Sequence, residues 1–345
     1  MITSLRAHPW AAPQQPDRFA SEWLSLRERL DFPARDRGLA VTLARRLPPR
    51  PVILDLGAGT GSLFRFLAPI IARPQHWIFA DADRSLIEAA FDHTLDWARD
   101  RGFTARRKRQ SRMPALSIDT SWGIWRIDAL AIGLATVPRG LPLDKVDAVT
   151  CSALLDLASR RWMERLFAAL RTPFYASLTV DGRDAWFPTH PADATVRLAF
   201  RRDQQREKGL GLALGVDAAR TAEELLAALG FETLAARSDW RIVRGERSMG
   251  RLFAGMTARA ASQAMPARAG RIGSWYRARL DDAGRARLAI RVGHSDILGF
   301  PPPGRDLAKG SADHDSLRLW LSPCGSTANS ADYLFQQLHP PGGAG

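Results

Sequence analysis

One turn constrains this chain more than any other segment, because it holds three alternating glycines, Gly57, Gly59 and Gly61. It follows a continuous apolar run at residues 52–54, which is typical of a strand buried on both faces of a parallel sheet. Glycine accepts positive φ angles in a sharp strand-to-helix turn and lets the backbone pass close to a ligand. The N–H groups at the start of the next helix, near Ser62, then favour an anionic group. The segment therefore predicts a strand, a tight turn, a helix and a ligand at the turn.

The spacing of these glycines does not fit the dinucleotide-binding fingerprint G-x-G-x-x-G. Counting from Gly57 leads to Ser62 at the third glycine position, and counting from Gly59 leads to Phe64. The spacing D-x-G-x-G-x-G, which starts at Asp55, instead resembles motif I of class I S-adenosylmethionine-dependent methyltransferases. The alternative is a tight turn that binds nothing. The resemblance implies S-adenosylmethionine as the cofactor. Its contacts in this segment would be Asp55, Gly57, Ala58, Gly59 and Gly61.

Acidic residues follow two later strand patterns at positions that the same family uses for the cofactor. Asp81 ends the second pattern, where a carboxylate can accept both ribose hydroxyls. Asp83 is expected mainly to cap the next helix. Asp128 ends the third pattern and matches the position that faces the adenine amino group, with a helix cap as the competing interpretation. Ala82 and Ala129 follow these acids and are also expected beside the cofactor.

Strand-like and helix-like segments alternate along most of the chain. The strand patterns lie at residues 52–54, 76–80, 123–128, 146–152, 174–180, just after Gly230 and at 287–293. This alternation predicts an α/β fold with a doubly wound, mostly parallel, seven-stranded Rossmann-like sheet. Two segments interrupt the alternation, at about residues 102–121 and 185–218, and are interpreted as insertions with helical parts. The second follows the fifth strand, beside the edge where open α/β sheets bind ligands, and is a candidate lid or substrate wall.

The chain divides into three parts on this interpretation. Residues 1–49 are expected to form an N-terminal helical cap, with two helices interrupted at Pro33. Residues 50–300 would form the methyltransferase-like domain with its two insertions. Residues 301–345 are rich in Gly, Pro and Ser without a sustained period, which predicts a poorly ordered tail.

The net charge of +13 and the pI near 11 raise the question of nucleic-acid binding. Nearly all of the positive charge is arginine, since lysine occurs only at positions 108, 145, 208 and 309. A bias toward Arg, Ala, Gly and Pro is typical of a GC-rich coding sequence, so a diffuse basic surface is favoured over a dedicated nucleic-acid face. Weak nucleic-acid binding through that surface stays open as an alternative.

The cysteines, Cys151 and Cys324, are too few for a disulfide framework or a cysteine-rich metal site. No set of His, Cys and acidic residues has metal-ligand spacing, so no metal is expected. No run approaches the ~20 apolar residues needed to cross a bilayer, and the first residues lack the apolar region of a signal peptide. The expectation is a soluble, cytoplasmic protein with no membrane partner.

The resemblance places the segment after the fourth strand near the methyl group. Cys151 and Ser152 would contact the cofactor there, with a small core residue as the alternative for Cys151. Asp156 would orient or deprotonate the acceptor, or cap the following helix. The segment lacks the N/D-P-P-Y/F signature for planar amino groups, which counts against DNA adenine methylation. Methyl transfer from a sulfonium depends largely on positioning, worth about 7–11 kcal/mol, so a strong base is optional.

Further candidates for the acceptor site come from the second insertion and from a later loop. They are Trp186, His190, Gln204, Lys208, Asp239 and Trp240. Trp186 and Trp240 would stack on a flat acceptor, although buried packing is the commoner role of tryptophan. Lys208 is a candidate substrate contact. His190 is a candidate general base, with an ordinary surface histidine as the default interpretation.

Three functions follow from these observations. The leading hypothesis is methyl transfer to a small-molecule acceptor, with residues 185–218 forming the acceptor pocket. The second is an RNA methyltransferase that holds phosphates with the arginines of residues 101–112. The third is a non-catalytic binding protein with the methyltransferase fold, against which the intact glycine turn and Asp81 argue. The sequence does not identify the acceptor or the oligomeric state, because one fold hosts many functions.

Overall fold

A nine-stranded sheet dominates the computed structural model, which describes residues 21–110 and 113–304. The spatial order of its strands is β3-β4-β5-β2-β1-β6-β7-β12-β9. The strands are β1 (Val52–Leu56), β2 (Gln75–Asp81), β3 (Thr104–Gln110), β4 (Met113–Thr120), β5 (Gly123–Ala131), β6 (Ala148–Ser152), β7 (Phe174–Val180), β9 (Glu232–Arg237) and β12 (His294–Phe300). The five central strands pair in parallel, and only β4 and β12 run against the rest of the sheet. The predicted α/β fold with a mostly parallel central sheet is confirmed.

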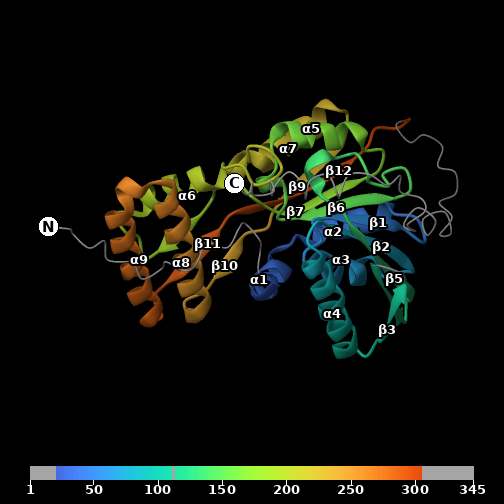
Figure 1. Cartoon of the computed structure of the whole chain (residues 1–345), viewed down its shortest axis with the longest axis horizontal. Coiled ribbons are helices and arrows are strands. Elements are labelled where there is room, and N and C mark those ends of the chain that lie inside the picture. The colour runs from blue at the N-terminus through green and yellow to red at the C-terminus, as the bar shows by residue number, and fades with distance from the viewer. Residues whose placement is uncertain (1–20, 111–112, 305–345) are drawn as a thin grey trace, which may run out of the picture. The chain divides into compact units, whose positions relative to one another are not determined.

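Helices cover both faces of this sheet (Figure 1). On one face lie α2 (Arg37–Arg46), α3 (Ser62–Ile71) and α4 (Arg84–Asp100), and on the other lie α5 (Arg160–Ala169) and α7 (Ala218–Ala228). The first face holds an aromatic core, in which Phe64 of α3 meets Trp77 and Phe79 of β2 edge to face at 5.3 and 5.8 Å between ring centres. Such pairs add about 0.5–1.5 kcal/mol each beyond the burial of their area. The core therefore fixes α3 against the strand that precedes Asp81.

Two strand assignments differ from the sequence prediction. The insertion at about residues 102–121 contains the hairpin β3–β4, which extends the sheet beyond β5, so the main sheet has nine strands among the described residues and not seven. The pattern at 287–293 belongs to a second sheet, and β12 supplies the strand beside β7. The sequence does not show β12 as an apolar run, because two of its buried residues, His294 and Asp296, are polar.

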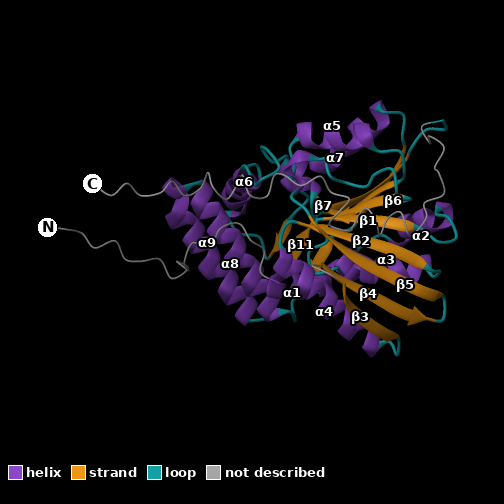
Figure 2. Ribbon diagram, turned by 45° about the vertical axis from the view of Figure 1, so that its right-hand side comes forward, coloured by secondary structure: helices purple, strands orange, loops and turns teal. Residues whose placement is uncertain are grey.

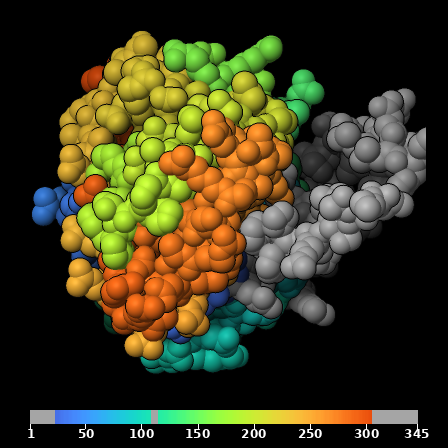
Figure 3. All heavy atoms as spheres, turned by 90° about the vertical axis from the view of Figure 1, so that its left-hand side faces the viewer, coloured from blue at the N-terminus to red at the C-terminus, as the bar shows by residue number. Residues whose placement is uncertain are grey.

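The second sheet has three short antiparallel strands in the order β10-β11-β8. They are β8 (Ala185–Phe187), β10 (Trp240–Ile242) and β11 (Ala289–Val292), and they pack with α6 (Asp193–Gln204), α8 (Arg247–Ala264) and α9 (Ala269–Gly284). This second lobe is built largely by the chain after β7 (Figure 2). In the space-filling view, α6 and α9 lie on the same face of it (Figure 3).

A two-stranded ribbon joins the main sheet to the second lobe. One strand runs from β7 into β8, and the other runs from β11 into β12, with His294 opposite Val180 and Ile290 opposite Trp186. Gly293 lies where the second strand passes between the sheets. A Cβ at this position would approach the Asp181 Oδ1 atom to 2.4 Å, so only glycine fits.

The N-terminal helix α1 (Ser21–Ala34) contacts α3 and β10. Pro33 lies inside α1, and the break between α1 and α2 falls two residues later than the sequence predicts. There, Asp36 caps α2 by accepting a hydrogen bond from the Leu39 N–H at 2.7 Å. Most of the tail predicted at 301–345 lies outside the described residues.

The remaining elements are four short 3₁₀ helices. They are η1 (Leu134–Thr136), η2 (Leu155–Leu157), η3 (Gly215–Asp217) and η4 (Pro266–Arg268). Of these, η2 and η3 matter for the site because they contact each other next to the carboxyl end of β6. Across the part of the chain that the structure describes, no helix combines the length and apolar character needed to span a membrane.

Candidate active site

The glycine turn adopts the positive φ angles that its sequence predicts. Gly57, Gly59 and Gly61 have φ angles of 63°, 53° and 78°, and α3 begins at Ser62. A Cβ at Gly61 would lie 3.2 Å from a ring carbon of Phe79, so the turn is also closed in sterically. The turn thus brings bare backbone to the carboxyl edge of β1, where open parallel sheets bind ligands.

Asp81 holds the glycine turn from the neighbouring strand. Its Oδ2 atom accepts a hydrogen bond from the Gly59 N–H at 2.9 Å, and its Oδ1 atom accepts one from the Asp83 N–H at 2.9 Å. Burial raises the pKa of this carboxyl above its ordinary value, and the backbone hydrogen bonds oppose that rise. Each carboxylate oxygen has a second lone pair, so Asp81 can still accept two hydroxyl donors. Asp83 caps α4 by accepting from the Ser85 N–H, as predicted.

Asp55 is a buried acid behind the turn. The Thr150 hydroxyl of β6 donates to its Oδ1 atom at 2.9 Å, while its Oδ2 atom has no hydrogen-bond partner among the described residues. Desolvation by burial raises the pKa of Asp55 to about 7. Cys151, one residue further along β6, is fully buried, and the same desolvation raises the pKa of its thiol well above the ordinary value. Burial therefore disfavours the thiolate form of Cys151.

A buried guanidinium that the sequence does not reveal connects four elements at this edge. Arg35, between α1 and α2, donates to the side-chain oxygens of Ser62, Ser152 and Ser177 at 2.7, 3.1 and 3.3 Å. Its nearest carboxylate, Asp31, is 3.9 Å away. Serine hydroxyls satisfy hydrogen-bond donors of Arg35, and its positive charge also acts on the buried carboxyls of Asp55 and Asp296, where it favours the ionised forms. No local pattern distinguishes Arg35 from the many other arginines of the chain.

Asp156 lies in η2, just beyond the carboxyl end of β6. It does not cap α5, because Ser159 does so by accepting from the Trp162 N–H at 3.3 Å. The Oδ1 atom of Asp156 is buried without a hydrogen-bond partner among the described residues. Burial raises the pKa of Asp156, and the positive charges of Lys208 and Arg27 oppose that rise.

The loop that follows α6 brings Lys208 toward Asp156. The Ser159 N–H and hydroxyl both donate to the Leu210 carbonyl, at 3.1 and 2.9 Å, so the loop packs on the start of α5. The structure thus brings two of the predicted site residues together, from segments about fifty positions apart.

Helix α1 covers the turn from the N-terminal side. Leu24 would lie 3.4 Å from a Cβ at Gly59, and Glu28 pairs with Arg65 of α3. On the far side of α1, the Trp240 indole N–H donates to Asp31 at 2.9 Å, and the Arg27 guanidinium stands 4.8 Å from the centre of the indole ring. Trp240 is therefore a buried packing residue that links α1 to β10, and one face of its ring already carries a cation.

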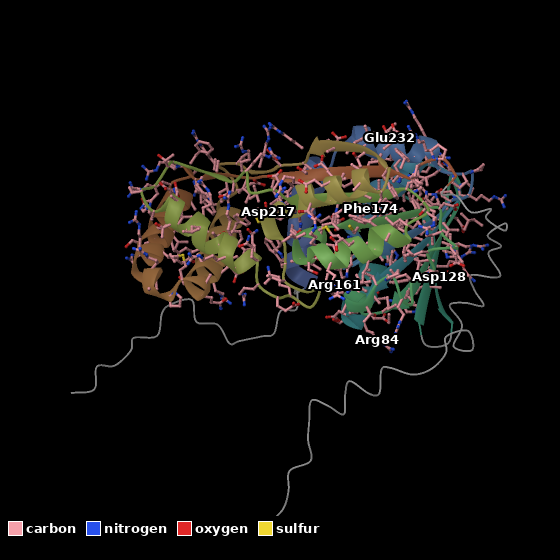
Figure 4. The ribbon with its side chains drawn as sticks, turned by 90° about the horizontal axis from the view of Figure 1, so that it is seen from above. Arg84, Asp128, Arg161, Phe174, Asp217 and Glu232 are labelled. Atoms are coloured by element: carbon pink, nitrogen blue, oxygen red, sulfur yellow. The ribbon has the colours of Figure 1, made fainter. Side chains whose placement is uncertain are left out.

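The prediction that Asp128 ends its strand is wrong. β5 continues to Ala131, which lies opposite Asp81, whereas Asp128 lies opposite Ile78 inside the sheet. Its carboxylate contacts the His76 ring at 2.6 Å, on the side of the molecule that carries β3 to β5 (Figure 4). Ala129 is buried in the aromatic core. The backbone that reaches the carboxyl edge next to Asp81 belongs instead to Ile132, whose N–H donates to the Asp81 carbonyl at 2.9 Å.

The structure does not bring the remaining predicted residues to this edge. His190 precedes α6 in the second lobe, where its Nδ1 atom accepts from the Ala192 N–H at 3.1 Å. Asp239, between β9 and β10, pairs at 2.9 Å with Arg183, which lies between β7 and β8 in the ribbon. Trp186 stacks on Phe253 of α8, so it lies in the core of the second lobe. Gln204, at the end of α6, lines a cavity there together with Trp186.

No group of His, Cys, Asp or Glu side chains within residues 21–110 and 113–304 has the arrangement of a metal site. The groups gathered at this edge are backbone N–H groups, carboxylates and the cationic side chains of Arg35 and Lys208. Such a set suits an organic ligand that carries hydroxyl, ammonium and carboxylate groups.

No protein family model matches the chain, and a comparison with curated proteins finds no relative. Solved structures match at low similarity. A Bacillus halodurans protein described as a methyltransferase has 11% identity and a TM-score of 0.42, with 77% of this chain and 100% of that chain covered. A Geobacter sulfurreducens S-adenosylmethionine-dependent methyltransferase in complex with S-adenosylhomocysteine has 15% identity and a TM-score of 0.37, with 78% and 92% covered.

A precorrin-6Y C5,15-methyltransferase from Geobacter metallireducens has 10% identity and a TM-score of 0.38, with 77% of this chain and 87% of that chain covered. At these identities and TM-scores, the matches carry no argument about activity. The fold assignment depends on the strand order and pairing of the chain itself.

Proposed function

We propose that this protein is an S-adenosylmethionine-dependent methyltransferase. The observation that carries the proposal is the pairing of the glycine turn with Asp81, because one carboxylate positions the turn and keeps lone pairs free at the strand edge. The spacing D-x-G-x-G-x-G from Asp55 supports it through its resemblance to motif I. A turn that bound nothing would have no need for three left-handed glycines beside an acid.

The residues present fit the cofactor. Asp81 would accept the ribose hydroxyls, with the Ala82 backbone beside it. The N–H groups at the start of α3, together with the nearby charge of Arg35, suit the carboxylate of the methionine part. Ser152, at the end of β6, faces the same edge through its hydrogen bond to Arg35.

The bound cofactor would supply an activated methyl group on a sulfonium. The chain's own contribution is to orient the acceptor and exclude water. α1 contributes to the exclusion, since Leu24 lies against Gly59. Asp156 would orient the acceptor or accept its proton, because burial favours the protonated form of this carboxyl while Lys208 and Arg27 favour the ionised one.

A small molecule is the acceptor that we propose, with the 185–218 insertion as a wall of its pocket. The loop that carries Lys208 supports this assignment, because it packs on the start of α5 and the positive charge of Lys208 acts on Asp156. The RNA alternative receives less support. Arg107 pairs with Glu88 and Asp92, and Arg101 stands 4.6 Å from the centre of the Trp97 ring, so these arginines are engaged within the fold.

Calorimetric titration with S-adenosylmethionine and S-adenosylhomocysteine tests the proposal. The wild type should bind both, Asp81→Ala should bind about ten- to hundredfold more weakly, and Gly59→Val should lose binding. Asp96→Ala is the matched control, because it removes an exposed acid of α4 that forms an ion pair with Arg99 on the same helix. Absence of wild-type binding at millimolar ligand would contradict the proposal and favour a non-catalytic binding protein.

A further inference from the structure

The small sheet β10-β11-β8 has one buried face and one face that is open to solvent. Burial alternates along all three strands, as in an antiparallel sheet that covers a core on one side only. The buried face contributes to the core of the second lobe the residues Trp186, Trp240, Ile242, Ile290 and Val292. We call the opposite face the outer face, and its residues are Ala185, Phe187, Arg241, Ala289 and Arg291.

Two arginines lie directly opposite each other on the outer face. Arg241 of β10 is the register partner of Arg291 of β11, and both side chains are exposed. Among the described residues, neither guanidinium has an ion-pair or hydrogen-bond partner. Like charges at directly opposite positions destabilise a sheet. The fold itself does not offset this repulsion, and such a violation of a local rule is expected where a surface binds a partner.

An exposed phenyl ring lies beside the arginine pair. Phe187 of β8 is 50% exposed and lies opposite Ala289, so it is diagonal to Arg291 on the same face. Diagonal neighbours across two antiparallel strands are about 7–8 Å apart, a distance that long side chains bridge. The other positions of the face on β8 and β11 hold the short side chains of Ala185 and Ala289. The ring and the two guanidinium groups are therefore accessible together.

Further positive charge follows β10 directly, in residues 243–247. Arg244 and Arg247 are exposed and have no ion-pair partner in the part of the chain that the structure describes. The acid of this segment is Glu246, which accepts a hydrogen bond from the Val243 N–H at 2.9 Å. Together with the arginine pair, the segment therefore carries four positive charges and one negative charge. The outer face and this segment complement a polyanion.

We propose that the outer face binds single-stranded nucleic acid. The arginine pair holds backbone phosphates, Arg244 and Arg247 extend these contacts, and the Phe187 ring stacks on an unpaired base. Aromatic side chains next to a basic surface bind single strands in this way, because every base has a flat face. The net charge of +13 leaves nucleic-acid binding open, and the outer face gives it a place. This inference goes beyond methyl transfer, because a strand can bind here without being the methyl acceptor.

Fluorescence anisotropy with a fluorescein-labelled oligouridylate of about 12 nucleotides tests the inference. The full-length protein is titrated at about 50 mM salt without S-adenosylmethionine, so failure of the methyl-transfer proposal would leave the outcome unchanged. We expect the single strand to bind more tightly than an RNA duplex of the same length, although the duplex carries twice the charge. No binding of the single strand, or tighter binding of the duplex, would overturn the proposal. Binding to phosphatidylserine vesicles without binding to the oligonucleotide would indicate a lipid surface and would equally contradict it.

Substitution of the arginine pair tests the phosphate contacts. Each contact contributes about 0.7 to the slope of log K against log salt for a single strand, so Arg241→Gln combined with Arg291→Gln should reduce the slope by about 1.4. Arg45→Gln combined with Arg161→Gln is the matched control. It removes two exposed arginines, from α2 and α5, that also have no ion-pair partner among the described residues, and it should leave the slope unchanged. An unchanged slope in the first variant, or an equal reduction in both, would contradict the assignment.

Substitution of Phe187 tests the stacking contact. Phe187→Leu keeps an apolar side chain without the ring and should weaken single-strand binding about tenfold, whereas Phe187→Trp should retain binding. Ile124→Ala is the control, because it shortens an apolar side chain of β5 that is 46% exposed and should leave binding unchanged. Circular dichroism checks folding, and if Phe187→Leu fails to fold, Phe187→Trp and the arginine variants decide. Unchanged binding in a folded Phe187→Leu protein would show that no base stacks on the ring.

Discussion

The Gly59 N–H donates to the Asp81 carboxylate across the gap between β1 and β2, at 2.9 Å. The same carboxylate holds the start of the following turn through the Asp83 N–H. One acid therefore sets the shape of the glycine turn and the direction of the next helix. A change at Asp81 should affect ligand binding in two ways, by removing an acceptor and by releasing the turn.

Asp81→Ala should weaken S-adenosylhomocysteine binding about ten- to hundredfold, because hydrogen bonds to a charged group contribute about 1.5–3 kcal/mol each. Asp81→Asn keeps one acceptor oxygen and should lose less. Calorimetry gives both values, with Asp96→Ala as reference. Equal affinity in the wild type and Asp81→Ala would show that the carboxylate does not touch the ligand.

Gly61→Ala should destabilise the fold by about 1–3 kcal/mol, since its φ of 78° disfavours a side chain and the new Cβ would crowd Phe79. Urea unfolding measures this change. Gly270→Ala in α9 is the matched control, because a Cβ there meets nothing within 4 Å. The control lies in the first turn of α9 and should change stability by less than about 0.5 kcal/mol. A neutral Gly61→Ala would mean that the turn can relax.

Asp55 should make stability fall as pH rises from about 4 to 7. Burial raises its pKa to about 7 in the folded chain, against about 3.9 when unfolded, so the folded state holds a proton that the unfolded state has lost. The stabilisation is complete below about pH 4 and is lost as pH rises through 7. Asp55→Asn should remove this component, as seen in the free energy of unfolding against pH. If the free energy of unfolding of Asp55→Asn varied with pH as that of the wild type does, another group would be responsible for the pH dependence.

His294 should act in the opposite direction. Burial lowers the pKa of its imidazole to about 3, against about 6.5 in an unfolded chain. Its contribution is therefore complete above about pH 6.5 and is lost as pH falls toward 3. His294→Asn keeps a donor for the Val292 carbonyl, which the ring nitrogen contacts at 3.0 Å. The variant should lose less stability than the wild type between pH 6.5 and 4, and equal loss would argue against this assignment.

The residues that sequence reasoning placed correctly are those whose conformation is set locally. Positive φ angles are predictable at Gly57, Gly59 and Gly61, and a helix cap is predictable at Asp83. Both features depend only on residues that are neighbours in the sequence. Asp128 was placed at the wrong point of its strand, since the end of β5 is set by pairing with Asp81 and not by its own residues.

Other site residues are defined by contacts between segments that are far apart in the sequence. Arg35 becomes part of the site only because Ser62, Ser152 and Ser177, which are far apart in the chain, meet around it. His190 is a candidate general base in the sequence, but the ribbon leads from the main sheet into the second lobe, and His190 lies there. Such outcomes depend on which strands pair, which no short pattern encodes.

The place of β12 between β7 and β9 bears on how the chain is made. Within the part of the chain that the structure describes, β9 pairs only with β12, and β8 and β10 pair only with β11, so all three lack partners until residues 289–300 are made. At about 5–20 residues per second, a ribosome needs roughly 3–13 seconds to go from the end of β9 to the end of β12. During that interval the nascent chain exposes three unpaired strands, and β11 and β12, which follow each other across Gly293, complete the second lobe and the main sheet in close succession.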